Sequence, residues 1–195
     1  MVHPNSESDK EYMSRLKAKK FSMYVFLVVT FMIFAAWSSG FIVYSAGSPD
    51  RGLKTLLPTT FIYSTLVIVI SSLFMHLAYK ASLAANFMKQ RLYLIVTIAL
   101  GCAFLVLQYL AWMHLATSGV VFINNNASQS FIYVFVWAHQ LHILAAVIVL
   151  LNALFKIDPK KALIKNTFRM ELASIFWHFL DILWIYIYVF LLLNQ

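Results

Sequence analysis

The 195-residue chain is poor in the residues that soluble and secreted proteins depend on. It contains one cysteine, Cys102, five glycines and four prolines, and only 11% of its residues are charged. One cysteine cannot close an intrachain disulfide, and so little glycine and proline excludes collagen-like and disordered classes. Ordinary soluble domains are about 25% charged, so a soluble globular fold is excluded as well.

Long apolar runs fill most of the chain instead. Hydrophobic residues make up 62% of it, and five near-continuous runs exceed the roughly 20 helical residues that cross a hydrocarbon core. These runs lack the alternation of a transmembrane β-barrel. We predict an all-α integral membrane protein, a five-helix bundle in which a polar, basic segment (1–20) precedes one membrane domain (21–195). The predicted spans are 21–44, 58–79, 92–116, 131–155 and 172–193.

The basic residues are distributed unevenly about these spans. Of the 15 lysines and arginines, only Arg51 and Lys54 lie in the first loop, and the other 13 lie in the N-terminal segment and the second and fourth loops. The positive-inside rule therefore predicts that the N-terminus is inside and the C-terminus outside. This distribution also explains the net charge of +8 without a nucleic-acid partner.

A few ionisable side chains fall at membrane depth, where each needs a partner or a task. The fourth span contains His139 and His142, the fifth contains His178 and Asp181, and Glu171 stands at the inner entrance of the fifth. Residues three apart share a helix face, and His142 and Asp181 each fall near the midplane of their spans. We predict that the five side chains form one polar network that joins the fourth and fifth helices.

Other tasks for this network are less consistent with the pattern. Its histidines and aspartate could nominally supply metal ligands, but histidines inside a bundle more often hydrogen-bond one another, a carboxylate or a carbonyl. A bis-histidine haem bundle does not fit His76 and His114, which stand alone near span ends. Cys102 has no basic neighbour in the sequence that would make its thiol reactive, so we expect it to be a buried structural thiol. We expect no catalytic, cofactor-binding or metal-binding residue in this chain.

A family resemblance appears in the fifth span. Residues 177–184 read WHFLDILW, and Glu171 lies six positions before Trp177. This pattern resembles the signature of subunit III of the haem-copper cytochrome c oxidases, and the resemblance extends over about residues 20–195. The residues that carry the signature here are Trp177, His178, Phe179, Asp181 and Trp184.

Three further spans are similar to the same family. The fourth reads His-Gln-Leu-His at 139–142, which is similar to the family's His-Gly-Leu-His. The third contains Gly101, Phe104 and Gln108, which resemble its Gly-x-x-Phe-x-x-x-Gln pattern. In the second, the serine pair at 71–72 fits the corresponding family helix.

The resemblance implies a function that lies mostly in neighbouring subunits. Five helices match the short form of the family, which lacks two helices of the longer form. Such a subunit packs beside the catalytic haem-copper subunit I and the copper-bearing subunit II, binds phospholipid, and supports proton uptake and stability during oxygen reduction coupled to electron transport. Haem and copper then belong to the partners, the location is a bacterial inner membrane, and membership of a larger respiratory supercomplex is left open.

Three positions depart from the family pattern. Thr30 stands where many members carry a membrane-buried glutamate, and Ala111 where a glutamate often follows the glutamine of the third helix. Gln140 replaces the glycine between the two histidines. The absence of two helices also removes one wall of the lipid cleft of the longer form.

Two alternative functions remain at this point. The related accessory protein of nitric oxide reductases shares the fold and the motifs. A small proton channel or transporter could instead use the midplane carboxylate and histidines as a relay. Against that second alternative, the chain lacks inverted repeats, and no proline interrupts the interior of a predicted span.

Overall fold

The computed structural model describes residues 7–47, 52–53, 57–123, 125–157 and 163–195. Within these residues the chain is helical, with no strand, and five helices are long and apolar enough to cross a membrane. The predicted all-α, five-helix fold is therefore confirmed. The helices are α1 (Glu7–Ala46), α2 (Thr60–Leu83), α3 (Phe87–Thr117), α4 (Ala127–Phe155) and α5 (Leu163–Leu193).

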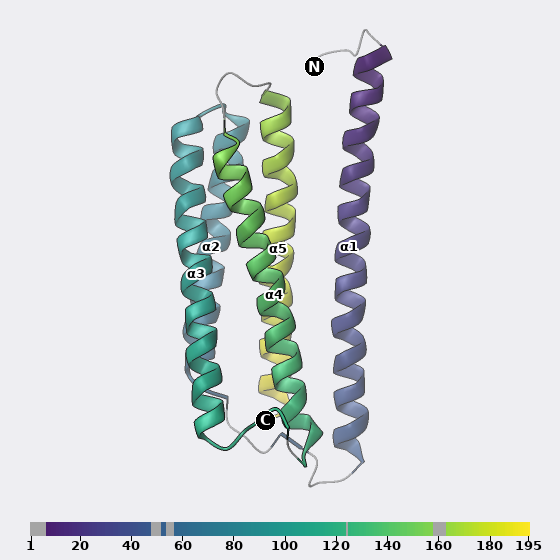
Figure 1. Ribbon diagram of the computed structural model, residues 1–195, viewed down its shortest axis with the longest axis vertical. Coiled ribbons are helices and arrows are strands. Elements are labelled where there is room, and N and C mark those ends of the chain that lie inside the picture. Colours follow the sequence, from purple (N-terminus) through teal and green to yellow (C-terminus); the bar gives the residue numbers. More distant parts are fainter. Residues whose placement is uncertain (1–6, 48–51, 54–56, 124, 158–162) are drawn as a thin grey trace.

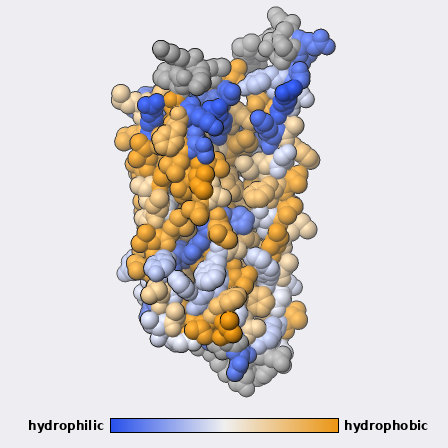
Figure 2. Space-filling model, viewed as in Figure 1, coloured by the Kyte–Doolittle hydropathy of each residue, from blue (hydrophilic) through white to orange (hydrophobic). Residues whose placement is uncertain are grey.

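Four of the helices form a bundle, and the fifth stands beside it. α2 packs against α3 and α5, and α4 packs against the same two helices, so α2–α5 close a four-helix ring. The longest helix, α1, lies along α4 and α5 (Figure 1). Figure 2 shows a largely apolar surface along the helices, with hydrophilic side chains gathered at the end from which α1 begins.

The helices extend beyond the predicted spans, most of all at the start of α1. Residues 7–20 of the polar segment predicted over 1–20 continue without a break into the first span, because α1 is continuous from Glu7. Strong helix formers fill this region, and Arg15 donates to Glu11 one turn earlier at 2.7 Å. Hydropathy locates the apolar part of a helix, so it missed this polar extension.

Local signals explain two of the helix starts. The side chain of Asn86 accepts a hydrogen bond from the backbone N–H of Lys89 at 3.1 Å and caps α3. Asn126 caps α4 in the same way through Ser128 at 3.0 Å. Asparagine is favoured at such positions because its short side chain satisfies an otherwise unpaired donor of the first turn.

The expectation that Cys102 is buried was wrong. Its thiol is exposed on α3, whereas the preceding residue, Gly101, faces the interior against Trp177. Successive residues of a helix are turned by about 100°, so the side chain after an inward position points outward. In a membrane helix an apolar run does not distinguish the two directions.

Candidate functional site

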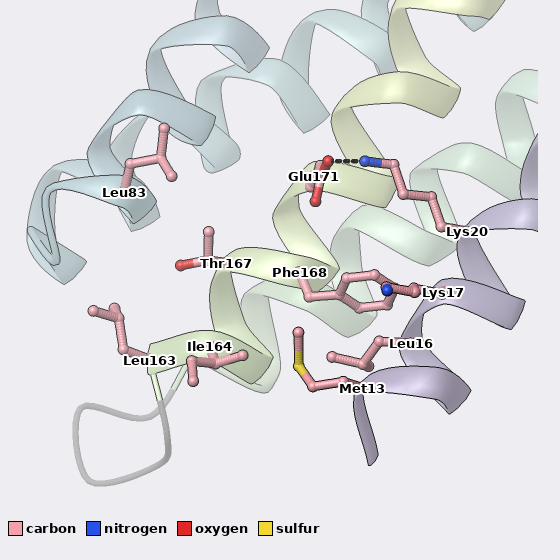
Figure 3. A pocket seen from close by; sticks show the side chains of 10 residues that line it. All are labelled: Met13, Leu16, Lys17, Lys20, Leu83, Leu163, Ile164, Thr167, Phe168 and Glu171. Atoms are coloured by element: carbon pink, nitrogen blue, oxygen red, sulfur yellow. Dashed lines mark hydrogen bonds and ion pairs between the residues drawn. The ribbon is translucent and has the colours of Figure 1, made fainter. Parts of the chain in front are cut away.

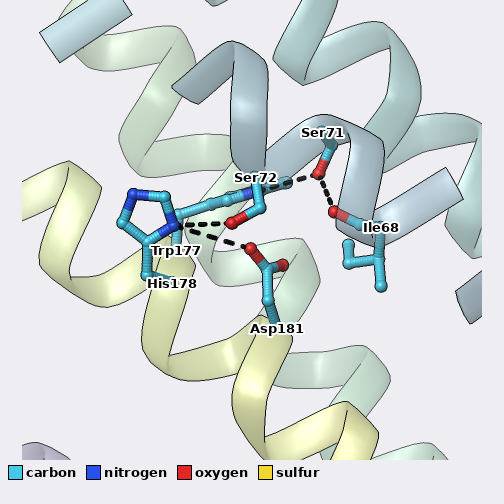
Figure 4. Close-up of polar contacts among 6 residues, drawn as sticks. All are labelled: Ile68, Ser71, Ser72, Trp177, His178 and Asp181. Atoms are coloured by element: carbon cyan, nitrogen blue, oxygen red, sulfur yellow. Dashed lines mark hydrogen bonds and ion pairs between the residues drawn. The ribbon is translucent and has the colours of Figure 1, made fainter. Parts of the chain in front are cut away.

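The most polar seam of the bundle lies between α2 and α5. Trp177 donates its indole N–H to the Ser71 hydroxyl at 3.0 Å, and Nδ1 of His178 lies 2.7 Å from the hydroxyl of Ser72 (Figure 4). Asp181 adds a buried carboxylate, with Oδ2 3.9 Å from the same His178 nitrogen. The seam is thus joined by direct side-chain hydrogen bonds at the centre of the bundle.

A second set of contacts repeats this arrangement two helical turns along α2. Trp184 donates its indole N–H to Thr65 Oγ1 at 3.0 Å, and Gln108 of α3 donates to Ser64 Oγ at 2.8 Å. The hydroxyl pairs at 64–65 and 71–72 are seven residues apart, so they lie on one face of α2. This spacing was the sequence signal for these acceptors, and the sequence reasoning used only the second pair.

Gly101 makes room on α3 for the indole ring of Trp177, which reaches across the bundle from α5. A Cβ atom at this position would lie 2.7 Å from Cη2 of Trp177 and 3.3 Å from a methyl group of Val147. Trp177 is fully buried and its indole N–H is held by Ser71, so the ring has little freedom to move. Gly101 and Trp177, which belong to two different family patterns, therefore contact each other.

The two histidines of α4 face different neighbours. His139 is fully buried, with its ring centroid 5.2 Å from that of Trp184 and 5.9 Å from that of Phe104. Neither of its ring nitrogens has a hydrogen-bond partner among the described residues. Ring packing, not a polar network, holds this histidine.

His142 faces α1 instead. Its Nδ1 lies 2.7 Å from the carbonyl oxygen of Ala138, one turn earlier in α4. Its ring packs near Phe26 and Phe34 of α1, with centroid separations of 6.3 and 6.0 Å. An offset of three residues turns side chains by about 60°, which is enough to direct one histidine into the ring of helices and the other toward α1.

Glu171 of α5 pairs with α1, and not with α4. Its carboxylate accepts a hydrogen bond from Lys20 of α1, beside a pocket of about 460 Å³ that lies between α1 and α5 and also reaches the end of α2 at Leu83 (Figure 3). The pocket lining is apolar apart from Lys17, Lys20, Thr167 and Glu171. This contact ties α1 to α5 near the end of the bundle where both helices begin to run alongside each other.

The five side chains predicted to form one network are therefore divided among separate contacts. The structure brings together His178 and Asp181, but it does not join them to His139, His142 or Glu171. The physical reason is that the rings of Trp184 and Phe104 occupy the space beside His139, while α2 supplies the partners of α5. Within the described ranges, no three His, Cys, Asp or Glu side chains are grouped as metal ligands.

The three residues that depart from the family pattern lie in mainly apolar surroundings. Thr30 is buried and donates to the carbonyl oxygen of Phe26 at 2.9 Å, so its own helix satisfies it. Ala111 is fully buried in the apolar core. Gln140 lines a mostly aromatic and aliphatic pocket between α3 and α4.

Similar proteins are subunits of respiratory oxidases. Quinol oxidase subunit 3 of Bacillus subtilis (strain 168) is 21% identical over 193 residues, covering 95% of this chain and 92% of that protein. Cytochrome c oxidase subunit 3 of Synechocystis sp. is 25% identical over 180 residues, covering 88% and 73%. Cytochrome bo(3) ubiquinol oxidase subunit 3 of Buchnera aphidicola is 26% identical over 180 residues, covering 90% and 94%.

A family model agrees with these similarities and with the fold. The model of cytochrome c oxidase subunit III matches residues 11–194, which include all of α2–α5 and all of α1 except its first four residues. The chain is thus a multi-pass membrane protein and the third subunit of an oxidase of quinol or cytochrome c type, in a complex with other oxidase subunits. The chain belongs to the cytochrome c oxidase subunit III family.

Proposed function

We propose that this chain is the non-redox accessory subunit III of a respiratory cytochrome c oxidase. It stabilises the catalytic subunit I, while haem and copper are held by subunits I and II. The observation that carries the proposal is the use of the signature residues: Trp177 and Trp184 hydrogen-bond to α2, and Gly101 of α3 packs against Trp177. The residues most typical of the family thus hold helices together, which is the task of a supporting subunit.

A quinol oxidase is the second candidate for the complex. It is favoured by the names of the relatives from Bacillus subtilis and Buchnera aphidicola, which are subunits of quinol oxidases. The accessory role of this chain is the same in both cases. The two candidates differ in the electron donor and therefore in the partner that receives the electrons.

The proposal includes a phospholipid in the pocket between α1 and α5. Its walls are mainly aliphatic and aromatic, and suit an acyl chain. Lys17 lies at the same pocket and has no carboxylate partner among the described residues, whereas Lys20 is paired with Glu171. A lipid phosphate would therefore meet Lys17, since ammonium groups near the membrane surface attract anionic headgroups.

The orientation follows from the charge distribution. We place the start of α1 and the connection from α4 to α5 on the inner side of a bacterial inner membrane, because these regions carry most of the basic residues. The carboxylate of Glu171 then lies toward the inner surface, on the side from which protons enter. This chain would therefore support proton uptake from its inner end, where Glu171 lies.

Purification through a tag on this chain tests the proposal. In mild detergent we expect haem-containing and copper-bearing oxidase subunits to copurify, visible in the absorption spectrum and in mass analysis of the proteins. A haem-containing partner without a copper-bearing subunit II would favour the quinol oxidase. A tagged chain that is well folded but free of haem protein would refute the accessory role.

Asp181→Ala is expected to weaken the attachment of this chain without altering the haem spectrum. The substitution removes a carboxylate that is 4% exposed and lies 3.9 Å from Nδ1 of His178, and it leaves that nitrogen with the Ser72 hydroxyl as its remaining polar contact. Loss of one partner of a buried polar contact costs about 1–3 kcal/mol. The amount of this chain per haem in the purified mutant oxidase measures the effect.

Asp181→Asn is the matched control, because it keeps the volume and the polarity of the side chain and removes only its charge and one acceptor oxygen. We expect its subunit ratio to lie closer to that of the wild type. Full retention of the Asp181→Ala subunit with normal thermal stability would show that the carboxylate has no role in the seam.

A further inference from the structure

Two histidines and a serine lie on the outward side of the α2–α5 pair, and we refer to Ser72, His76 and His178 as the histidine face. His76 is exposed, Ser72 is half-buried, and the side chain of His178 is 32% exposed. The ring centroids of the two histidines are 6.3 Å apart. Figure 4 shows His178 and Ser72 at this seam, with the buried side chain of Asp181 beside them.

The histidine face lies on the membrane-spanning part of both helices. His178 is six residues inside the predicted fifth span (172–193), and His76 is three residues inside the end of the predicted second span (58–79). At 1.5 Å per residue these are roughly 9 and 5 Å from the span ends, so both side chains lie within the hydrocarbon core, nearer its inner surface than its centre.

No other helix of the described chain covers this face. The bundle leaves the outer side of the α2–α5 pair open, since α1 lies against α4 and α5 and leaves His76 exposed. The ring nitrogens of His76 have no hydrogen-bond partner among the described residues, unlike the Nδ1 of His178. Ionisable residues within membrane helices almost always face a protein interior or a water-filled cavity, because hydrocarbon cannot hydrogen-bond to them.

We infer that a transmembrane helix of another oxidase subunit covers the histidine face and places a neutral hydrogen-bonding side chain against His76. The inference rests on the proposed function, which gives this chain its neighbours. Acyl chains offer no donor or acceptor at this depth, whereas a hydroxyl or amide on a packed helix offers both.

A charged partner would be less suitable than a neutral one. The carboxylate of Asp181 already lies 3.9 Å from His178 and has no hydrogen-bond partner in the described residues. A second carboxylate on the docked helix would add a like charge in a medium of low dielectric constant, where such repulsion is strong. Serine, threonine, asparagine or glutamine avoids that cost and still satisfies the imidazole.

Site-specific photo-crosslinking in the intact oxidase tests this surface. The photoreactive amino acid p-benzoylphenylalanine replaces His76, and the crosslinked peptides are identified after irradiation of native membranes. The control position is Ile95 of α3, which is 51% exposed and lies about as far from the start of α3 as His76 lies from the end of α2, at the same end of the bundle. We expect position 76 to crosslink to a transmembrane segment of another oxidase subunit, and position 95 to crosslink at most weakly to that segment.

Crosslinks from position 76 to lipid alone, or to a second copy of this chain, would overturn the inference. So would equal crosslinking of the same segment from positions 76 and 95. If haem protein copurifies with the tagged chain but position 76 reaches only lipid, this inference fails while the proposed function stands. If no haem protein copurifies, both fail.

His76→Leu gives a second test, in which two readouts should move differently. In the isolated full chain, leucine replaces an unpaired polar group at a lipid-facing position, so thermal stability in detergent should be unchanged or raised. In the complex, loss of an interhelical hydrogen bond should increase dissociation of this chain about three- to fivefold. Ile95→Leu should change neither quantity. Unchanged retention of the His76→Leu chain, or a less stable isolated chain, would contradict a role in docking.

Discussion

Gly101→Ala is expected to lower the free energy of unfolding of this chain by about 2–3 kcal/mol. The added methyl group would lie 2.7 Å from Cη2 of Trp177, closer than carbon atoms approach without displacement. The ring cannot turn away cheaply, because it is fully buried and its indole N–H is bonded to Ser71. Either α3 moves outward or the hydrogen bond to α2 breaks, so two helix contacts are affected by one methyl group.

Gly40→Ala is the control for this prediction. At that position of α1, the nearest atom to a new Cβ is Phe131 Cζ at 3.6 Å, which is an ordinary contact. Alanine is also the better helix former, by about 1 kcal/mol, so Gly40→Ala should be neutral or slightly stabilising. Thermal unfolding of the two purified variants in the same detergent measures the difference, and equal melting temperatures would show that the α3–α5 contact is adaptable.

Trp184→Ala is expected to be at least as damaging, with a cost of about 3–5 kcal/mol. Trp184 is fully buried and fills the middle of the bundle, with ring centroids 5.2 Å from both His139 and Phe104. Its indole N–H also donates to Thr65 at 3.0 Å. Alanine would leave a cavity beside a histidine that already has no hydrogen-bond partner among the described residues.

Two control variants separate packing from hydrogen bonding at this position. Thr65→Val removes the acceptor of the indole N–H but keeps the volume, and should cost only about 1–3 kcal/mol. Trp137→Ala removes an indole that is 42% exposed, and should cost less than its buried counterpart because no closed cavity forms. A Trp184→Ala oxidase that keeps this chain as firmly as the Trp137→Ala oxidase would contradict the central position of Trp184.

The fold could be predicted because hydrocarbon imposes a simple rule. Every backbone group must be satisfied within the segment, so five apolar runs of sufficient length predict five helices. The same rule is silent about polar helix extensions, and for this reason the start of α1 at Glu7 was missed. Nor does the rule predict which way a side chain points around the helix, and for this reason the exposure of Cys102 was not predicted.

The contacts between side chains of different helices were harder to predict from the sequence than the helices themselves. Shared faces predicted correctly that His178 and Asp181 lie together, since residues three apart on one helix are neighbours. Which helices meet across the bundle is not encoded in any one span. His142 therefore faces α1 and Glu171 pairs with Lys20, although both were assigned to a network between α4 and α5. The spacing of hydroxyls along α2 was the signal for its contact with α5.

The distribution of haem and copper within the oxidase tests the account most directly. The complex is purified through a tag on a partner subunit, this chain is removed with detergent, and both fractions are analysed for haem and metal. The account predicts that all haem and copper stay with the remaining subunits, and that the separated chain carries neither. Haem or copper in stoichiometric amount on the separated chain would contradict the claim that this subunit supports redox chemistry without taking part in it.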